Sequence, residues 1–136
     1  MPDRSFETTI PFVEVAGVGW YPLLQVTFLK PNRQKLYLPL LFDTGADQIC
    51  LHPDWQHFFP NLRDTTFYGT GHEKAAPGKN TKGQVEFLGR IIDCEIGFAQ
   101  MQSYTWMAGV VGRDCFKPFG FGFWESAREL YVTLKP

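Results

Sequence analysis

The stretch of sequence that decides the fold is Leu40-Leu41-Phe42-Asp43-Thr44-Gly45-Ala46-Asp47. Apolar residues alternate through residues 36–42, which predicts a strand that ends just before Asp43. Gly45 lets the backbone turn closely and brings a backbone N–H near the carboxylate, and Thr44 adds a hydroxyl that can hydrogen-bond a neighbouring backbone. We therefore expect an immobilised, partly desolvated carboxylate of the kind that acid–base catalysis requires. The alternative is an Asp that only begins a turn.

The composition around this stretch indicates one folded domain, residues 1–136. Hydrophobic residues make up 44% of the 136 residues and charged residues 20%, which excludes a disordered chain. The formal net charge is −1, so the chain lacks the basic surface that nucleic-acid binding needs. No segment approaches 18 consecutive apolar residues, and we expect no membrane contact.

Short runs separated by turn residues predict an all-β protein with seven or eight strands and little helix. The predicted strands lie at residues 24–28, 36–42, 65–68, 85–88, 91–98, 106–111, 119–123 and 130–134. Single helical turns are expected at residues 54–57 and 114–117, and residues 69–82 are polar and glycine-rich, typical of a loop or a hairpin arm. Pro39 indicates that one edge of its strand is not fully paired. Short strands in this number predict a small closed or folded-over sheet.

The sequence of residues 40–47 resembles the active-site signature of retropepsin-like aspartic proteases, the single-domain relatives of pepsin. A second motif, Val110-Val111-Gly112-Arg113-Asp114, resembles the later motif of that family, and the two are in the right order. Residues 85–98 resemble the strand pair after the flap, so the resemblance covers residues 23–134. It looks closest to free-standing prokaryotic members. The resemblance implies the acid-protease folded sheet or barrel, with one short helix before the C-terminal strands.

The resemblance also implies roles for particular residues. Asp43 matches the catalytic aspartate, Thr44 the residue that braces the two active-site loops, and Gly45 the glycine beneath the reacting water. Ala46 and Asp47 match positions that contact the substrate.

Asp47 is further expected to form a partly buried, bidentate pair with Arg113, for which Lys would be a poor substitute. Arg113 and Gly112 would thus support the site from behind.

The sequence contains one Asp-Thr-Gly, whereas aspartic protease chemistry needs two carboxylates that share one proton. A single-copy chain must obtain the second carboxylate from a symmetry mate. We therefore predict a homodimer with Asp43 of each chain at the two-fold axis, acting on peptide or protein substrates.

The flap is the part of the family pattern that this sequence matches least. Tyr68, Gly69, Thr70 and Gly71 are the candidate flap tip and substrate contacts, although the two glycines are equally consistent with an ordinary surface turn. The polar run after them is long, so the tip could instead lie nearer Pro77-Gly78. Because the flap is poorly matched, a second function stays open: a non-catalytic peptide-binding or dimerisation module on the protease fold.

The cysteines and histidines favour neither disulfides nor a metal. Cys50, Cys94 and Cys115 are odd in number and lack C-x-x-C spacing, which favours a reducing, cytoplasmic setting. Cys50 and His52 would share one face of a strand, with His57 nearby, but no second pair completes a ligand set. We expect no metal and no cofactor.

Overall fold

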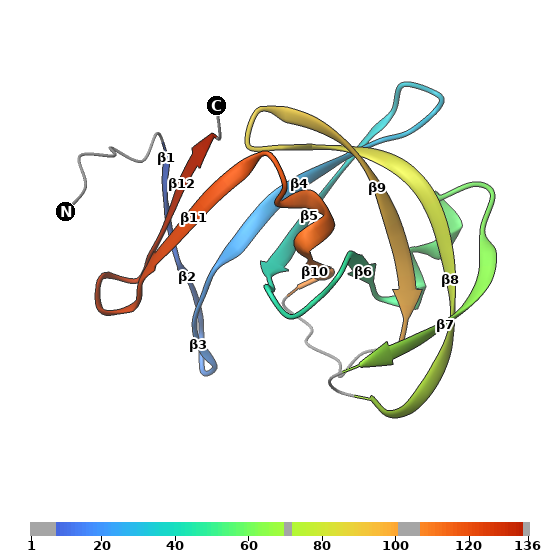
Figure 1. Ribbon diagram of the computed structural model, residues 1–136, viewed down its shortest axis with the longest axis horizontal. Coiled ribbons are helices and arrows are strands. Elements are labelled where there is room, and N and C mark those ends of the chain that lie inside the picture. The colour runs from blue at the N-terminus through green and yellow to red at the C-terminus, as the bar shows by residue number, and fades with distance from the viewer. Residues whose placement is uncertain (1–7, 70–71, 101–106, 135–136) are drawn as a thin grey trace.

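The computed structural model describes residues 8–69, 72–100 and 107–134 (Figure 1). The described part of the chain forms strands and short 3-10 turns. The strands are β1 (Thr8–Pro11), β2 (Val13–Val15), β3 (Gly19–Tyr21), β4 (Leu23–Leu29), β5 (Lys35–Phe42), β6 (Ile49–Leu51), β7 (Arg63–Gly69), β8 (His72–Phe87), β9 (Arg90–Ala99), β10 (Gly109–Val111), β11 (Phe119–Trp124) and β12 (Glu129–Leu134). The 3-10 turns are η1 (Pro53–Phe58), η2 (Arg113–Cys115) and η3 (Glu125–Ala127).

Six strands close into a barrel. Their order around it is β4-β5-β10-β6-β9-β8, and the end of β8 pairs back with β4. The first half of β8 runs past the barrel and pairs with β7 instead, so the β7–β8 hairpin projects from the barrel (Figure 1). The barrel thus positions two parts of the chain: the segment between β5 and β6, and the projecting hairpin.

The core of the barrel follows the alternation of the sequence. Every second residue of β4 and, from Leu38 onward, of β5 is buried, among them Val26, Phe28 and Leu40. Ile96 and Phe98 of β9 face the same core. Each fully buried side chain of this size contributes about 1.5–3 kcal/mol relative to an exposed one, so this alternation explains why the strands lie in this register.

A second sheet, β1-β12-β11, lies beside the barrel, and the β2–β3 hairpin extends from the same side (Figure 1). The sequence predicted no strand before residue 23, so β1, β2 and β3 are additions to that expectation. Their pairing explains the omission: β1 pairs with β12, more than 110 residues later in the chain. A strand of only four residues carries too little local pattern to be predicted without its distant pairing partner.

The segment 69–82 settles between two alternatives. Its polar, glycine-rich composition predicted a loop or a hairpin arm, and the structure shows the arm: β8 is a regular strand from His72. It pairs with β7 on one edge and then with β9 on the other, and this pairing outweighs the weak strand propensity of the sequence. The described residues therefore contain twelve strands and not seven or eight.

The predicted helical turns are present as 3-10 turns. η1 covers the expected residues 54–57, and η2 begins one residue earlier than expected and spans only Arg113–Cys115. The incompletely paired strand edge predicted from Pro39 is present, because β10 pairs with β5 only from Leu40 onward. No helix in the described part of the chain is long and apolar enough to cross a membrane.

Candidate active site

The loop after β5 holds the Asp43 carboxylate in place. The backbone N–H of Asp43 donates to the carbonyl of Val111 at 3.1 Å, which continues the pairing of β5 with β10. The N–H of Gly45 donates to Asp43 Oδ1 at 2.9 Å, so the contact predicted from the tight turn is confirmed. Asp43 is half-buried, whereas Thr44 and Gly45 are exposed. The carboxylate is thus fixed by its own loop and open on one side.

The two motifs of the sequence meet at this loop. β10 lies between β5 and β6, the strands on either side of the loop, and η2 follows β10 directly. The N–H of Arg113 donates to the carbonyl of Ala46 at 2.9 Å, and the N–H of Asp114 donates to the carbonyl of Asp47 at 2.9 Å. The second motif therefore binds the backbone of the first.

Gly112 is the residue that allows this close approach. A Cβ at position 112 would lie 2.6 Å from the carbonyl oxygens of Ala46 and Gln48 and 2.7 Å from the backbone nitrogen of Gln48. The φ of Gly112 is −111°, which any residue can adopt. Glycine is therefore required here for space and not for its backbone conformation, and the loop presses against η2 without a side chain between them.

The ion pair between Asp47 and Arg113 forms, but the expected burial is wrong for the single chain. Arg113 Nη2 contacts Asp47 Oδ1, and the two side chains are 63% and 84% exposed, respectively. One oxygen accepts from one nitrogen, so the contact is also not the bidentate pair that was expected. Both side chains extend into solvent, and the backbone hydrogen bonds from η2 join it to the loop without requiring the ion pair to be buried. Exposed pairs of this kind contribute about 0.2–1 kcal/mol.

A chain of polar side chains continues from the loop to β8 and β9. Gln48 Nε2 donates to Asn80 Oδ1 at 3.2 Å, and Asn80 Nδ2 donates to Glu95 Oε2 at 2.6 Å. The N–H of Glu95 donates in turn to Asp114 Oδ2 at 3.0 Å. The sequence pattern did not single out Gln48, Asn80 or Glu95. Only Asp114 carried a signal, as the last residue of the second motif.

The β7–β8 hairpin supplies the candidate flap. Gly69, the last residue of β7, pairs with His72, the first residue of β8, and Thr70 and Gly71 lie outside the described residues. The alternative tip at Pro77-Gly78 is wrong, because both residues are paired inside β8. Tyr68 is 81% exposed next to the turn. The structure therefore brings Tyr68 and Gly69, the described residues of the expected flap, to the end of β7 in a long projecting hairpin.

Phe67 anchors the base of this hairpin. A Cβ on Gly78 or on Gly97 would come within 2.6 Å of the Phe67 ring, so the ring lies directly over two glycines of β8 and β9. A Cβ on Gly97 would also meet the Gln48 amide at 2.5 Å. The base of the hairpin and the Asp43 loop thus share a contact at Gln48.

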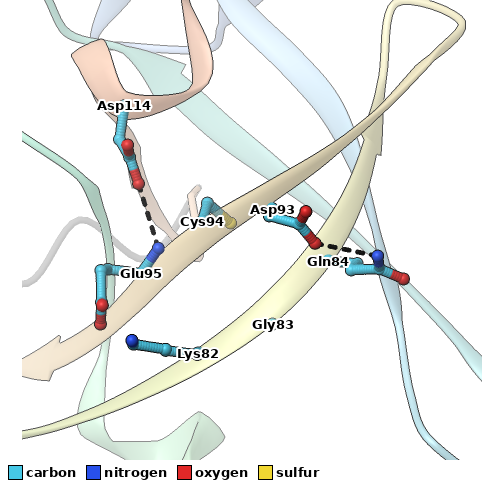
Figure 2. Close-up of a pocket in the computed structure, with 7 residues that line it drawn as sticks. All are labelled: Lys82, Gly83, Gln84, Asp93, Cys94, Glu95 and Asp114. Carbon is cyan, nitrogen blue, oxygen red and sulfur yellow. Dashed lines mark hydrogen bonds between the residues drawn. The ribbon is translucent and has the colours of Figure 1, made fainter.

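A pocket of about 600 Å³ lies on the outer side of β8 and β9 (Figure 2). It is lined by Lys82, Gly83, Gln84, Asp93, Cys94, Glu95 and Asp114. Figure 2 shows Gln84 donating to Asp93 at 2.9 Å and the Glu95 backbone donating to Asp114. Asp43 is not among the lining residues, so we assign the chemistry to the loop and not to this pocket.

His52 and the cysteines of the described residues lie in structural positions. No group of three His, Cys, Asp or Glu side chains in this part of the chain could hold a metal ion. His52 Nδ1 accepts the N–H of Asp54 and caps η1. Burial raises the pKa of Cys50 to about 11. A hydrogen bond with Cys115, together with burial, raises the pKa of Cys94 far above its ordinary value.

Comparison with known proteins identifies the fold. Sequence comparison finds neither a matching protein family nor a similar curated protein. Structure comparison finds the EIAV protease, solved in complex with the inhibitor HBY-793, with a TM-score of 0.51 and 21% sequence identity. The match covers 77% of this chain and 92% of the EIAV chain. The predicted all-β, retropepsin-like fold is therefore confirmed. This likeness shows the fold alone and does not bear on the expected prokaryotic grouping.

Proposed function

We propose that this chain is an aspartic endopeptidase that acts as a homodimer, with Asp43 of each chain in one active site. The observation that carries the proposal is the Asp43 loop: a carboxylate at the end of a barrel strand, held by the Gly45 N–H and open to solvent on one side. It lies in an Asp-Thr-Gly sequence on a retropepsin-like fold. The other residues of the loop and the projecting hairpin are arranged as this chemistry would use them.

The reaction needs both carboxylates because each has a different task. Two like charges about 3 Å apart cannot both ionise, so the pair shares one proton. The charged carboxylate takes a proton from a water molecule, whose oxygen attacks the peptide carbonyl carbon. The neutral one gives its proton to the carbonyl oxygen. When the tetrahedral diol intermediate collapses, the C–N bond breaks and the departing nitrogen takes a proton from the neutral carboxyl. A hydroxyl of the diol returns its proton to the charged carboxylate as the new carboxyl group forms, so the pair again shares one proton.

The remaining site residues take supporting roles in this proposal. Thr44 braces its loop against that of the second chain, and Gly45 lies beneath the water. Ala46 and Asp47 contact the backbone of the bound peptide. The hairpin tip, residues 68–71, closes over the peptide from the other side. The hydrogen bonds from η2 hold the backbone of Ala46 and Asp47 in fixed positions, which supports their proposed role as contacts to the peptide.

The cellular setting follows from the sequence alone. An odd number of cysteines without pairing motifs favours the cytoplasm, and the resemblance favours a free-standing prokaryotic enzyme. Both stay predictions, as does the treatment of residues 1–136 as one protease domain.

Cleavage of a peptide library by purified protein tests the proposed function. We expect Asp43→Asn to lower kcat/KM by at least about 10³-fold without loss of fold, because the amide cannot exchange the proton. Asp64→Asn is the matched control, since Asp64 is an exposed carboxylate on β7 that pairs with Lys79. Its cleavage rate should equal that of the unmodified protein.

A statine-type transition-state mimic separates the two function classes. Inhibition of cleavage by the mimic supports the protease. Peptide binding without any cleavage, in a protein that is folded and dimeric, would instead support the non-catalytic binding module. Cleavage that persists in Asp43→Asn would remove Asp43 from the mechanism.

A further inference from the structure

Two of the three cysteines lie together in the core, although they are on elements that are separate in the sequence. Cys94 is in β9, Cys115 is the last residue of η2, and both side chains are buried. The two thiols form a hydrogen bond, so their sulfur atoms are in contact. The next residues along the chain also meet, because the Glu95 N–H donates to Asp114 Oδ2 at 3.0 Å. The fold thus holds two thiols side by side at the junction of β9 and η2.

Cys94 is the member of this pair that a small molecule can reach. It lines the pocket of about 600 Å³ on the outer side of β8 and β9, and Figure 2 shows it on β9 next to the η2 turn that carries Asp114. Its cross-strand partner in β8 is Gly83, so no side chain lies directly opposite the thiol. Cys115, in contrast, is fully buried.

We infer that Cys94 and Cys115 are a dithiol that hydrogen peroxide converts into a disulfide, and that this disulfide fixes η2 to β9. The N–H groups of Arg113 and Asp114 in η2 bind the backbone of the Asp43 loop. A covalent bond at Cys115 therefore acts on the segment that holds the loop. The inference concerns the support of the loop and does not depend on the proposed function.

The oxidation takes two steps, and each step releases one water molecule. The sulfur of Cys94 attacks one peroxide oxygen, the O–O bond breaks, and the thiol proton leaves with the departing hydroxide as water. Cys94 is then a sulfenic acid. The sulfur of Cys115 attacks the sulfur of Cys94, the S–O bond breaks, and the hydroxyl leaves with the Cys115 proton as a second water. The two thiols lose two electrons in total, and the peroxide gains them.

The surroundings of the pair determine how readily and how far this reaction proceeds. The hydrogen bond with Cys115, together with burial, raises the pKa of Cys94, so little thiolate is present and the pair stays reduced until an oxidant enters the pocket. Once the sulfenic acid forms, Cys115 is already in contact with it and reacts before a second peroxide arrives. The third cysteine, Cys50, contacts the backbone of Ala99 instead, and we expect its thiol to remain.

Mild treatment of the purified protein with hydrogen peroxide tests the inference. Thiol titration in denaturant should find three free thiols in the reduced protein and one in the oxidised protein. Trypsin cleaves after Arg113, so the two cysteines fall in different peptides. Without reductant these peptides should stay joined, and dithiothreitol should separate them. Cys50→Ala, the matched control, should form the same link, whereas Cys115→Ala should not.

The disulfide should also stabilise the folded chain. It closes a segment of about 20 residues, which restricts the unfolded chain and should raise the Tm by about 5–10 °C. Hydrogen exchange of the Arg113 and Asp114 amides should become slower in the oxidised protein, because both N–H groups bind the loop. None of these measurements involves peptide cleavage, so failure of this inference and failure of the proposed function are distinguishable.

Three free thiols after peroxide treatment, or a link that involves Cys50, would overturn the inference. Sulfinic acid at Cys94 without a link would also overturn it, because the second thiol would then lie too far away to react first. A link that changes neither the Tm nor the amide exchange would contradict the effect on η2. If Cys115→Ala does not fold, the peptide map of the unmodified chain decides between these outcomes.

Discussion

The Asp43 loop and the β7–β8 hairpin would form the two sides of the proposed cleft, yet they are held in different ways. Backbone groups of β10 and η2 hold the loop at Asp43, Ala46 and Asp47, and no side chain separates it from Gly112. The hairpin extends from the barrel: before Gly78, β8 pairs with β7 and not with β9, and the Phe67 ring packs over Gly78 and Gly97 where this extension begins. Backbone contacts on several sides make a rigid element, whereas two strands that pair only with each other open more readily. The difference suits a fixed carboxylate and a moving cover.

Substitution of Gly112 tests whether the Asp43 loop is rigid. Gly112→Ala should lower the free energy of unfolding by about 1–3 kcal/mol, because the new methyl group meets backbone oxygens of the loop that cannot move independently. Denaturant unfolding measures the change, and peptide cleavage should fall with it. Gly83→Ala is a matched control: its Cβ meets only the end of the Ile96 side chain, so the cost should be smaller. Equal costs at both positions would show that the loop is not rigid.

Substitution of Phe67 tests whether the β7–β8 hairpin opens independently of the loop. Phe67→Ala should destabilise the protein by about 1–2 kcal/mol, since a half-buried ring leaves its place over Gly78 and Gly97. Hydrogen exchange should then become faster in β7 while the amides of β5 and β10 stay protected. Tyr68→Ala, at the exposed neighbouring position, should leave the stability unchanged. Uniform acceleration of exchange in the barrel would mean that the hairpin and the loop open together.

Substitution of Arg113, which forms an ion pair with Asp47, tests whether side chains stabilise the loop in addition to the backbone hydrogen bonds. Arg113→Ala should cost the single chain only about 0.2–1 kcal/mol, because both partners are exposed. The difference should shrink further in about 1 M salt, where screening is strong. Thermal unfolding at low protein concentration measures it. A loss of about 3 kcal/mol or more would show that the pair is buried, for example by a second copy.

The smallest effect at neutral pH is expected from Cys50, which follows the loop in β6. Burial raises its pKa from 9.0 to about 11 in the folded chain. The unfolded thiol therefore releases its proton first as the pH rises from 9 to 11, and stability is lost through that window while remaining constant at pH 7. Cys50→Ser should flatten this dependence, leaving the part due to Cys94. Denaturant unfolding between about pH 7 and 11 that shows the same slope for both proteins would contradict the assignment.

Local pattern was sufficient to predict the parts of the molecule whose contacts are close in sequence. The strand ending at Asp43 and the Gly45 N–H at its carboxylate follow from alternation and from a tight turn, and both are confirmed. The segment 69–82 was ambiguous, because polar residues and glycines favour a loop until β7 and β9 pair with them. Gln48, Asn80 and Glu95 were missed because each is an ordinary polar residue until the fold joins them.

The sequence by itself determined the all-β class and the place of Asp43, because periodicity and turn chemistry act over a few residues. The retropepsin-like arrangement was predicted from the resemblance of two short motifs to a known family. Only the tertiary structure decided that β1 pairs with β12, that η2 supports the loop through its backbone, and that the pair of Asp47 and Arg113 is exposed. These features depend on contacts between segments 66 or more residues apart. Burial and register at such contacts are set by the whole packed chain, and no local pattern contains them.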